Sequence, residues 1–447
     1  MIREGILLFP NRPEESVTYR SRVAGLSLLE RGIRTMAKAG IDKVFVVMPP
    51  AAKLNLTAFT RKLPLELQFL SWGSAPAAAE LPGGDFLVLL GDYVHHHSSL
   101  TDLMSRKLGD LNAIVQVGDP QQRGVNMVVE AGPRLTFSAT DSATEAPDGL
   151  VSTGAFLCAA NLFSPQEVTD DHRDFWTLLA GKADTRHSQH AFAQPLWRRV
   201  GDRRDARAVK NMLFGQVTKK TSGFVSRHLN ARLSIPTSKI LVETGLSPHM
   251  ITMLLVMPTG LVAAYLMLSP YEYPKLALSG ILWHLAAVFD RCDGEVARVK
   301  LCESKFGAWF DTVTDNIAYV CASLCFLAGF SKVHPEPVYM IIGLSCIGML
   351  LVFLVVMYIS AWRSGSGSLQ HFMTNFTKQV TEADRGLIYR ILQRGTFMGK
   401  RDFFSFFYLL TAVANSIEVF FLFAALLYIV QLIGAVSFYR RMHRVAH

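Results

Sequence analysis

Cysteine is scarce in this chain, and its arrangement excludes two kinds of structural support. Six cysteines are spread over 447 residues, and no two of them stand in a CxxC pair. Three of them, Cys321, Cys325 and Cys346, lie inside strongly apolar stretches. The sequence therefore predicts neither a disulfide framework nor a zinc site.

We do not expect the N-terminal residues to act as a secretory signal. The opening residues, MIREGILLFPNRP, contain an apolar stretch that is too short for such a signal. Residues 1–210 also lack the long apolar runs that crowd the last part of the chain. We therefore expect a soluble N-terminal unit that stays in the cytoplasm, followed by a membrane unit.

Acidic residues are outnumbered by basic ones, which gives a formal net charge of +9. Half of the residues are hydrophobic, and many of the lysines and arginines flank apolar runs. This distribution favours contact with anionic lipid headgroups and control of membrane orientation. We expect membrane lipids, and no nucleic acid, as partners.

The N-terminal unit has the pattern of an α/β domain. Residues 2–9 read as a first strand, and residues 23–40 carry apolar positions at helical spacing with Gly40 as a stop. Further strands are expected at 42–50, 85–94, 113–118 and 126–132. Strands that alternate with helices predict a mostly parallel sheet with ligands at the carboxyl ends of its strands.

Three segments of this unit resemble the sugar-phosphate nucleotidyltransferase family, namely residues 23–47, 87–94 and 152–163. The resemblance implies a Rossmann-like domain over residues 1–210, with a metal-binding aspartate at Asp92. The family opens with a glycine-rich phosphate loop, whereas residues 9–22 contain no glycine. Since glycine allows the backbone to wrap around a phosphate, we predict a degenerate or regulatory domain, with an active nucleotidyltransferase as the alternative.

A run of three histidines, residues 95–97, follows the strand that ends near Asp92. Three consecutive side chains do not readily converge on one ion, and no partner spacing follows them. We therefore predict an ordinary loop here.

Residues 216–250 are both basic and amphipathic. Phe224, Leu229 and Leu233 alternate with Arg227 and Arg232. Because an apolar stretch follows at once, we predict a juxtamembrane helix at the membrane surface, with an ordinary interdomain helix as the alternative.

Apolar segments in the second half predict an all-α membrane domain over residues 251–440 with six spans. The segments cover residues 251–269, 275–291, 308–330, 337–361, 403–415 and 417–438. Positive charge gathers in alternate connectors and in the C-terminal tail RRMHR. We therefore expect a multi-pass protein of the cell (inner) membrane with both termini in the cytoplasm.

Four aspartates interrupt these apolar segments. Asp290 and Asp293 share one face of the second span, and Asp311 and Asp315 share one face of the third. Packing of the two helices brings the four carboxylates together, and unpaired negative charge there would be very unfavourable. Hard oxygen ligands suit Mg²⁺ or Mn²⁺, and two such ions would clamp a pyrophosphate during in-line displacement.

Small and basic residues accompany the aspartates. Gly294 and Ala297 leave room for a ligand beside the second span, and Arg298 can contact a phosphate. Gly307 can allow tight contact between the two helices.

The complete pattern is D-x2-D-G-x2-A-R-x8-G-x3-D-x3-D, from Asp290 to Asp315. It identifies residues 216–440 as similar to the CDP-alcohol phosphotransferase family, in which a substituted phosphate passes from a CDP-alcohol to an alcohol or phosphorylated alcohol and CMP is released. The resemblance covers SRHLNARLS and LSPHMIT, where many relatives have asparagine in place of His249.

The resemblance implies a role for each motif residue. Asp290 and Asp311 would bridge two divalent ions, with Asp293 on one ion and Asp315 on the other, and Asp315 would be the general base. The residues that would seat the CDP group are Asp290, Asp293, Gly294, Ala297, Arg298 and Gly307. The family also implies a homodimer.

Three questions remain open at this point. Arg363, Lys378 and Arg401 lie on basic connectors and are candidates for binding an acceptor phosphate, although they fit equally well as determinants of orientation. The two halves together resemble bifunctional proteins that make CDP-inositol and then di-myo-inositol phosphate phosphate. A transporter that uses intramembrane carboxylates is a lesser alternative, because the aspartate pattern has no internal repeat.

Overall fold

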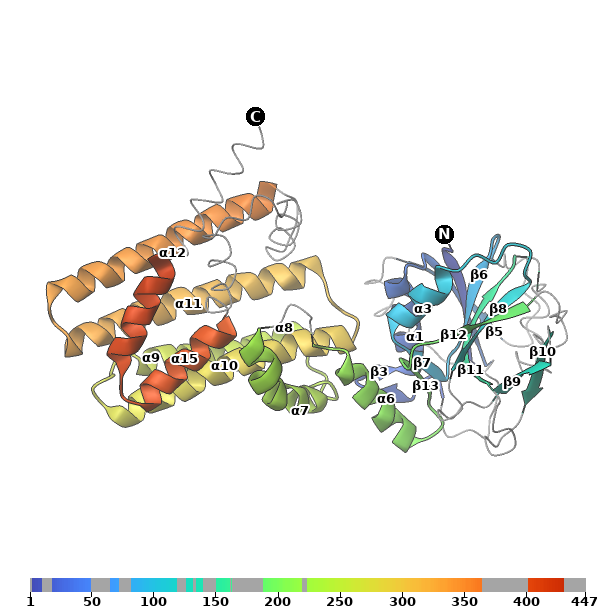
Figure 1. Cartoon of the computed structure of the whole chain (residues 1–447), viewed down its shortest axis with the longest axis horizontal. Helices are drawn as coiled ribbons and strands as arrows, with labels where there is room; N and C mark the ends of the chain where they lie inside the picture. Colours follow the sequence, from blue (N-terminus) through green and yellow to red (C-terminus); the bar gives the residue numbers. More distant parts are fainter. Residues whose placement is uncertain are drawn as a thin grey trace. The chain divides into compact units, whose positions relative to one another are not determined.

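The computed structural model describes most of the chain in two units (Figure 1). The described residues are 2–9, 18–49, 65–71, 82–118, 126–131, 134–139, 150–160, 162, 188–218, 223–363 and 401–429. Unit 1 comprises residues 1–216 and 299–301, and unit 2 comprises residues 217–298 and 302–447.

Unit 1 is built on a nine-stranded mixed sheet with the order β10-β9-β11-β6-β1-β4-β5, and β8 and β12 extend from β11. The strands are β1 (Glu4–Leu8), β4 (Lys43–Met48), β5 (Glu66–Ser71), β6 (Phe86–Leu90), β8 (Ala113–Gly118), β9 (Asn126–Ala131), β10 (Arg134–Ala139), β11 (Leu150–Cys158) and β12 (Ser188–Phe192). The predicted strands at 2–9, 42–50, 113–118 and 126–132 are therefore confirmed, whereas the strand expected at 85–94 is divided by a turn at residues 91–92 into β6 and β7 (Tyr93–His95).

The sheet is mixed, with parallel pairs among the N-terminal strands and between β8 and β12. β5, β4, β1 and β6 run parallel to one another, as expected for strands joined by crossovers. β11 pairs antiparallel with β6, β8 and β9, and β10 pairs antiparallel with β9. The prediction of a mostly parallel sheet is thus right for β5, β4, β1 and β6 and wrong for β9, β10 and β11, although β12 again pairs parallel with β8.

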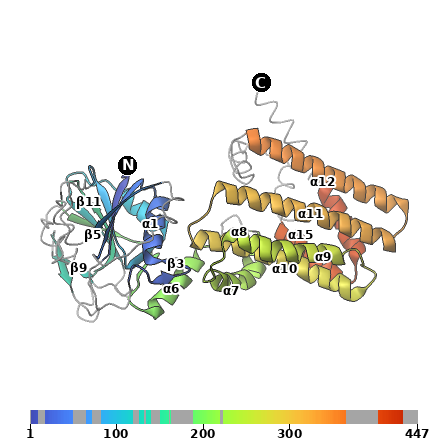
Figure 2. The ribbon, with the colours of Figure 1, turned by 180° about the vertical axis from the view of Figure 1, so that it is seen from behind.

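Helix α1 (Leu28–Ala39) packs beside α3 (His97–Met104) (Figure 1), and the view from behind shows α1 against the sheet (Figure 2). The Ser27 side chain caps its N-terminus by accepting from the Glu30 amide. Gly40 ends it in the left-handed conformation, with φ of 105°, which confirms the predicted stop. The helix begins later than Val23, because residues 22–27 form a hairpin of β2 (Arg22–Val23) and β3 (Leu26–Ser27).

The histidine run divides between two elements instead of forming a loop. His95 ends β7 (Tyr93–His95), which pairs with β13 (Trp197–Arg199), and His97 begins α3. His95 is buried, and its Nε2 lies 2.8 Å from the Thr153 carbonyl oxygen. Burial lowers the pKa of His95 to about 4, so the ring is neutral at pH 7.

Unit 2 is helical. It follows α6 (Arg203–Gly215) of unit 1. Its elements are π-helix η2 (Ser226–Asn230), α7 (Ala231–Leu241), α8 (Pro248–Ile251), π-helix η3 (Thr252–Val256), α9 (Met257–Leu266), α10 (Tyr273–Val299), α11 (Lys305–Val333), α12 (Pro337–Arg363) and α15 (Arg401–Val413). Residues 417–429 form a further helix. Helix α11 contacts both α9 and α12 (Figure 1).

Two helical runs in the described part of the chain are long and apolar enough to cross a membrane, Pro248–Leu266 and Lys305–Val333. Two shorter apolar helices cover Pro337–Val352 and Ile417–Ile429. Helices thus stand at each of the six predicted spans, although residues 430–438 of the last one lie outside the described residues. The count of six spans stays a prediction.

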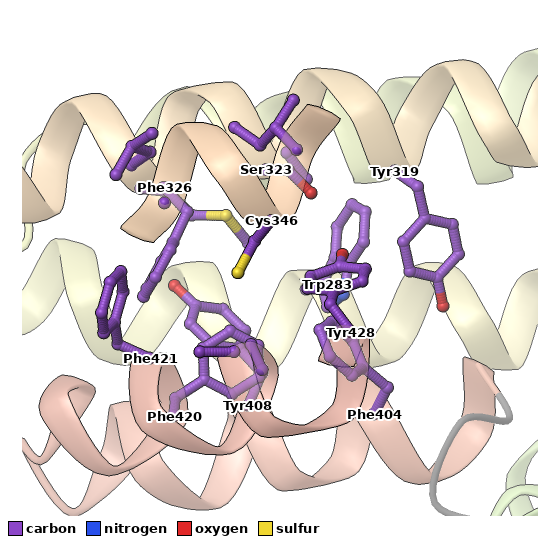
Figure 3. Close-up of a pocket in the computed structure, with 17 residues that line it drawn as sticks. Trp283, Tyr319, Ser323, Phe326, Cys346, Phe404, Tyr408, Phe420, Phe421 and Tyr428 are labelled. Carbon is purple, nitrogen blue, oxygen red and sulfur yellow. The ribbon is translucent and has the colours of Figure 1, made fainter. Parts of the chain in front are cut away.

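Small residues allow close helix contacts in unit 2. A Cβ on Gly280 of α10 would lie 2.8 Å from the Ala412 Cβ of α15, and one on Gly329 of α11 would clash with the Met267 carbonyl oxygen. Beside these contacts, aromatic side chains line an apolar pocket that extends from Tyr319 at one end to Phe421 at the other (Figure 3). The helices therefore pack closely at Gly280 and Gly329, and an apolar pocket lies among the aromatic side chains.

Candidate active site

Helices α10 and α11 bring three aspartates of the motif together. Asp290, Asp293 and Asp311 each offer a carboxylate oxygen, and these three oxygens lie within 4.8 Å of one another. Asp290 and Asp293 are one turn apart on α10, and Asp311 faces them from α11. The predicted convergence of carboxylates from two helices is therefore present for these three residues.

Asp315 lies one turn beyond Asp311, where it is paired with an arginine from α15. Arg401 Nη1 donates to Asp315 Oδ1 and also lies 2.7 Å from Asp290 Oδ1. Its guanidinium carbon is 5.9 Å from the centre of the Tyr319 ring. One basic group is thus placed among the carboxylates.

Thr252 is a member of the site that sequence reasoning missed. Its hydroxyl donates to Asp293 Oδ2, and both side chains are buried. Thr252 begins η3, directly after the segment LSPHMI, whose Ser247 caps α8. The available signal was its position at the end of LSPHMIT, within the part of the chain that resembles the phosphotransferases.

The predicted donor-binding residues line the same stretch of α10. The atoms nearest to a Cβ added at Gly294 belong to the guanidinium group of Arg298, at 3.3 Å, and Ala297 is half-buried. The Nε of Arg298 is buried without a hydrogen-bond partner among the described residues. This donor is free to bind an anion such as a phosphate.

Gly307 has a different neighbour from the one predicted. A Cβ on it would lie 3.2 Å from the His249 ring, so its small size makes room for α8 rather than for α10. The His249 ring also packs edge-on against Phe306 and Phe310. The histidine therefore fills space at the N-terminus of α11.

The carboxylate cluster fits a divalent cation. Its donors are hard carboxylate oxygens, which Mg²⁺ and Mn²⁺ prefer. Asp311 Oδ1 is buried and has no hydrogen-bond partner among the described residues. Because a buried carboxylate oxygen without a partner is unfavourable, a bound cation would supply the missing interaction.

A second polar network holds α10 from another face. Glu295 is fully buried, and it accepts hydrogen bonds from Ser234 (2.9 Å), Ser238 (2.8 Å) and Arg291 (2.7 Å). Arg291 also donates to Ser226 and Thr218. Because Arg291 and Glu295 lie on a different face from Asp290 and Asp293, these bonds fix the direction in which the aspartates point.

In unit 1, Asp92 follows β6, at the strand end where a nucleotidyltransferase metal ligand was predicted. Its Oδ2 accepts a hydrogen bond of 2.7 Å from Arg199 Nε. The side chains of Asp92 and Arg199 are 11% and 18% exposed, so this is a largely buried ion pair.

Of the three residues predicted to bind the acceptor, the structure describes only the side chain of Arg401. Arg401 lies at the carboxylates, as described above. Arg363 is the last residue of α12, and neither its side chain nor any part of Lys378 is among the described residues.

Comparison with known proteins gives the class of the helical unit. Residues 246–436 match the family model described as CDP-alcohol phosphatidyltransferase. The chain therefore contains a CDP-alcohol phosphatidyltransferase domain and is a phosphotransferase.

Curated relatives extend the similarity. The chain is 25% identical over 432 residues to "Bifunctional IPC transferase and DIPP synthase" of Thermococcus kodakarensis, which covers 91% of this chain and 89% of that protein. It is 29% identical over 320 residues to the protein of the same name from Rubrobacter xylanophilus, covering 67% of this chain and 70% of that one. It is also 32% identical over 147 residues to phosphatidylinositol phosphate synthase of Mycobacterium tuberculosis, covering 32% and 63%.

Among solved structures, the inositol-1-phosphate CTP transferase from T. maritima aligns with a TM-score of 0.36 and 17% identity. The alignment covers 47% of this chain and 95% of that one.

Proposed function

We propose that unit 2 transfers a substituted phosphate from a CDP-alcohol to the hydroxyl of an alcohol or phosphorylated alcohol, within a membrane, and releases CMP. The observation that carries this proposal is the approach of the Asp290, Asp293 and Asp311 oxygens to within 4.8 Å. Such a cluster between apolar helices is stable only with bound cations or other positive charge. Phosphoryl transfer from a nucleotide is a reaction that requires this kind of site.

Different residues of unit 2 bind the donor and accept the proton. Arg298, with its free Nε, and the open surface at Gly294 and Ala297 seat the diphosphate of the donor. Asp315 accepts the proton of the acceptor hydroxyl, whose oxygen then attacks the phosphorus next to the donor alcohol. The bond from that phosphorus to the CMP oxygen breaks, and CMP leaves.

Asp290, Asp293, Asp311 and Asp315 would hold two Mg²⁺ or Mn²⁺ ions. Bound there, the ions offset the negative charge that develops on the transferred phosphate and on CMP. Thr252 keeps the Asp293 carboxylate in position through its hydroxyl hydrogen bond.

A multi-pass location in the cell membrane, with six spans, cytoplasmic termini and a homodimer, belongs to the same proposal. The surface of the juxtamembrane segment supports it. Phe224, Leu233 and Ile240 are 74%, 54% and 70% exposed, whereas Ser234 and Ser238 of the same segment are buried. A helix whose apolar side chains face outward, beside exposed Arg227 and Arg232, suits the membrane surface.

A screen of CMP release tests the proposal. Full-length protein in detergent is given CDP-diacylglycerol or CDP-inositol with glycerol 3-phosphate, inositol, inositol phosphate or serine, with and without Mg²⁺. We expect release for one pair, dependent on Mg²⁺, and a loss of at least about 100-fold in Asp315→Asn, since general base catalysis contributes on this scale. Glu272→Gln, at an exposed ion pair, is the matched control. Full release by Asp315→Asn would remove that residue from the mechanism.

A second candidate function concerns unit 1, which would make the CDP-alcohol from CTP and an alcohol phosphate. It is favoured by the match to the Thermococcus kodakarensis protein, which extends over 91% of this chain. Two observations oppose it and favour the predicted degenerate domain: residues 9–22 lack glycine, and Arg199 occupies the Asp92 carboxylate.

Pyrophosphate release separates these alternatives for unit 1. The full-length protein is given CTP, Mg²⁺ and inositol 1-phosphate, and pyrophosphate is measured. Steady release that is lost in Asp92→Asn would establish the synthetic activity, whereas no release would support the degenerate domain.

A further inference from the structure

The guanidinium group of Arg401 occupies one side of the carboxylate cluster. Its Nη1 lies 2.7 Å from Asp290 Oδ1 and also contacts Asp315 Oδ1. The arginine side chain is 16% exposed, and the two aspartates are 22% and 23% exposed. Since Arg401 is the first residue of α15, this charge reaches the aspartates of α10 and α11 from a third helix.

The cluster therefore has two sides. On one side, oxygens of Asp290, Asp293 and Asp311 lie within 4.8 Å of one another, and Asp311 Oδ1 has no hydrogen-bond partner among the described residues. On the other side, Asp290 and Asp315 already share a positive group. The three carboxylates on the first side can bind a metal cation, whereas the second side already holds the guanidinium group of Arg401.

The net charge of the cluster depends on how many divalent ions it holds beside the guanidinium group. One divalent ion together with the guanidinium group offsets three of the four carboxylate charges. A second divalent ion beside the guanidinium would leave the cluster with excess positive charge. In a poorly hydrated site such an excess is unfavourable until an anion arrives.

We propose that Arg401 acts as a built-in cation at Asp290 and Asp315, so that the protein without its donor binds one divalent ion and takes a second only when a nucleotide diphosphate is present. The proposal rests on the phosphotransferase function given above. It assigns Arg401 to the control of metal loading, whereas the sequence had indicated acceptor binding or membrane orientation.

A purely structural role for Arg401 makes a different prediction. If the ion pairs only hold α15 against α10 and α11, Arg401→Gln lowers the melting temperature and leaves the number of bound ions unchanged. The number of ions bound at saturation therefore separates the two roles.

The test is a Mn²⁺ titration of full-length protein in detergent, with free Mn²⁺ followed by electron paramagnetic resonance. We expect one bound ion per chain in the wild type, two after addition of CDP, and two in Arg401→Gln without CDP. Arg401→Lys, which keeps the charge, and Arg232→Gln, at an exposed arginine of α7, should both bind one.

Two bound ions in the wild type without CDP, or one in a folded Arg401→Gln, would overturn the proposal. The wild-type comparison with and without CDP decides the matter if Arg401→Gln does not fold, and an unchanged count would overturn it. These outcomes leave CMP release intact, so they are distinct from failure of the proposed function, in which neither Mn²⁺ binding nor CMP release is found.

Discussion

The Arg291 Nε lies 2.7 Å from Glu295 Oε1, one turn away on α10, and the Glu295 side chain has no exposed surface. Three serines and a threonine supply the remaining partners of this pair. A buried ion pair with its hydrogen bonds satisfied is stable, but removal of one partner leaves the other charge buried and alone.

We therefore expect Glu295→Ala to lower the free energy of unfolding by roughly 3–5 kcal/mol. Thermal melting in detergent measures the effect. Glu272→Ala removes an exposed pair with Lys275, at 2.6 Å, and should cost less than about 1 kcal/mol. Equal melting temperatures for the two variants would contradict a stabilising role for the buried network.

Thr252 provides a test of how the aspartates are held. Thr252→Val keeps the shape of the side chain and removes the hydroxyl that donates to Asp293. Because a hydrogen bond to a charged group contributes about 1.5–3 kcal/mol, we expect CMP release to fall by about tenfold or more. Thr252→Ser should retain most of the activity, and equal loss in both variants would point to packing instead.

Helices α10 and α15 are in close contact at Gly280 and Ala412, and moving a methyl group from one position to the other tests this contact. Gly280→Ala places a Cβ 2.8 Å from that of Ala412 and 3.2 Å from the Leu409 Cα. We expect a destabilisation of about 1–3 kcal/mol, because overpacking displaces the helices. Adding Ala412→Gly should restore part of the loss, and an additive double variant would show that the two positions do not interact.

Because His95 is buried and neutral, we expect the stability of unit 1 to depend on pH. Burial lowers the pKa of His95 from its ordinary value of 6.5 to about 4, so the unfolded chain binds the proton more readily. Stability is therefore fully present above pH 6.5 and falls as the pH drops toward 4, by up to about 3 kcal/mol.

Hydrogen exchange of the β7 and β11 amides against pH measures this effect. His95→Gln keeps a donor for the Thr153 carbonyl and has no titrating ring, so its exchange should vary less between pH 6.5 and 4. An identical pH profile in the variant would show that other groups, such as His96, whose pKa is also lowered to about 4 by partial burial, dominate.

The sequence predicted the features that depend on neighbouring residues. The strand at 113–118 and the stop at Gly40 are local patterns, and both are found where expected. The helix expected from Val23 begins at Leu28, because Ala24 and Gly25 take positive φ values and turn the chain into a hairpin. Apolar spacing alone does not distinguish such a hairpin from a first helical turn.

At the site, the aspartate motif was informative because spacing along two helices determines which side chains share a face. The sequence did not place Thr252 or Arg401 beside the aspartates. Thr252 is 41 residues from Asp293 in the chain, and Arg401 is 86 residues from Asp315. The role of the serines in 226–238 was also missed. Ser226, Ser234 and Ser238 are spaced eight and four residues apart and so share a helix face, but their partners on α10 lie more than 50 residues away.

The serine contacts of α7 determine where this chain can be divided for study. The first apolar run begins at residue 251, which makes that position a natural choice for a truncated membrane fragment. A fragment starting there would lose Thr218, Ser226, Ser234 and Ser238, and with them most partners of Arg291 and Glu295. An expression boundary before Val217 keeps these partners with the helix that carries Asp290 and Asp293.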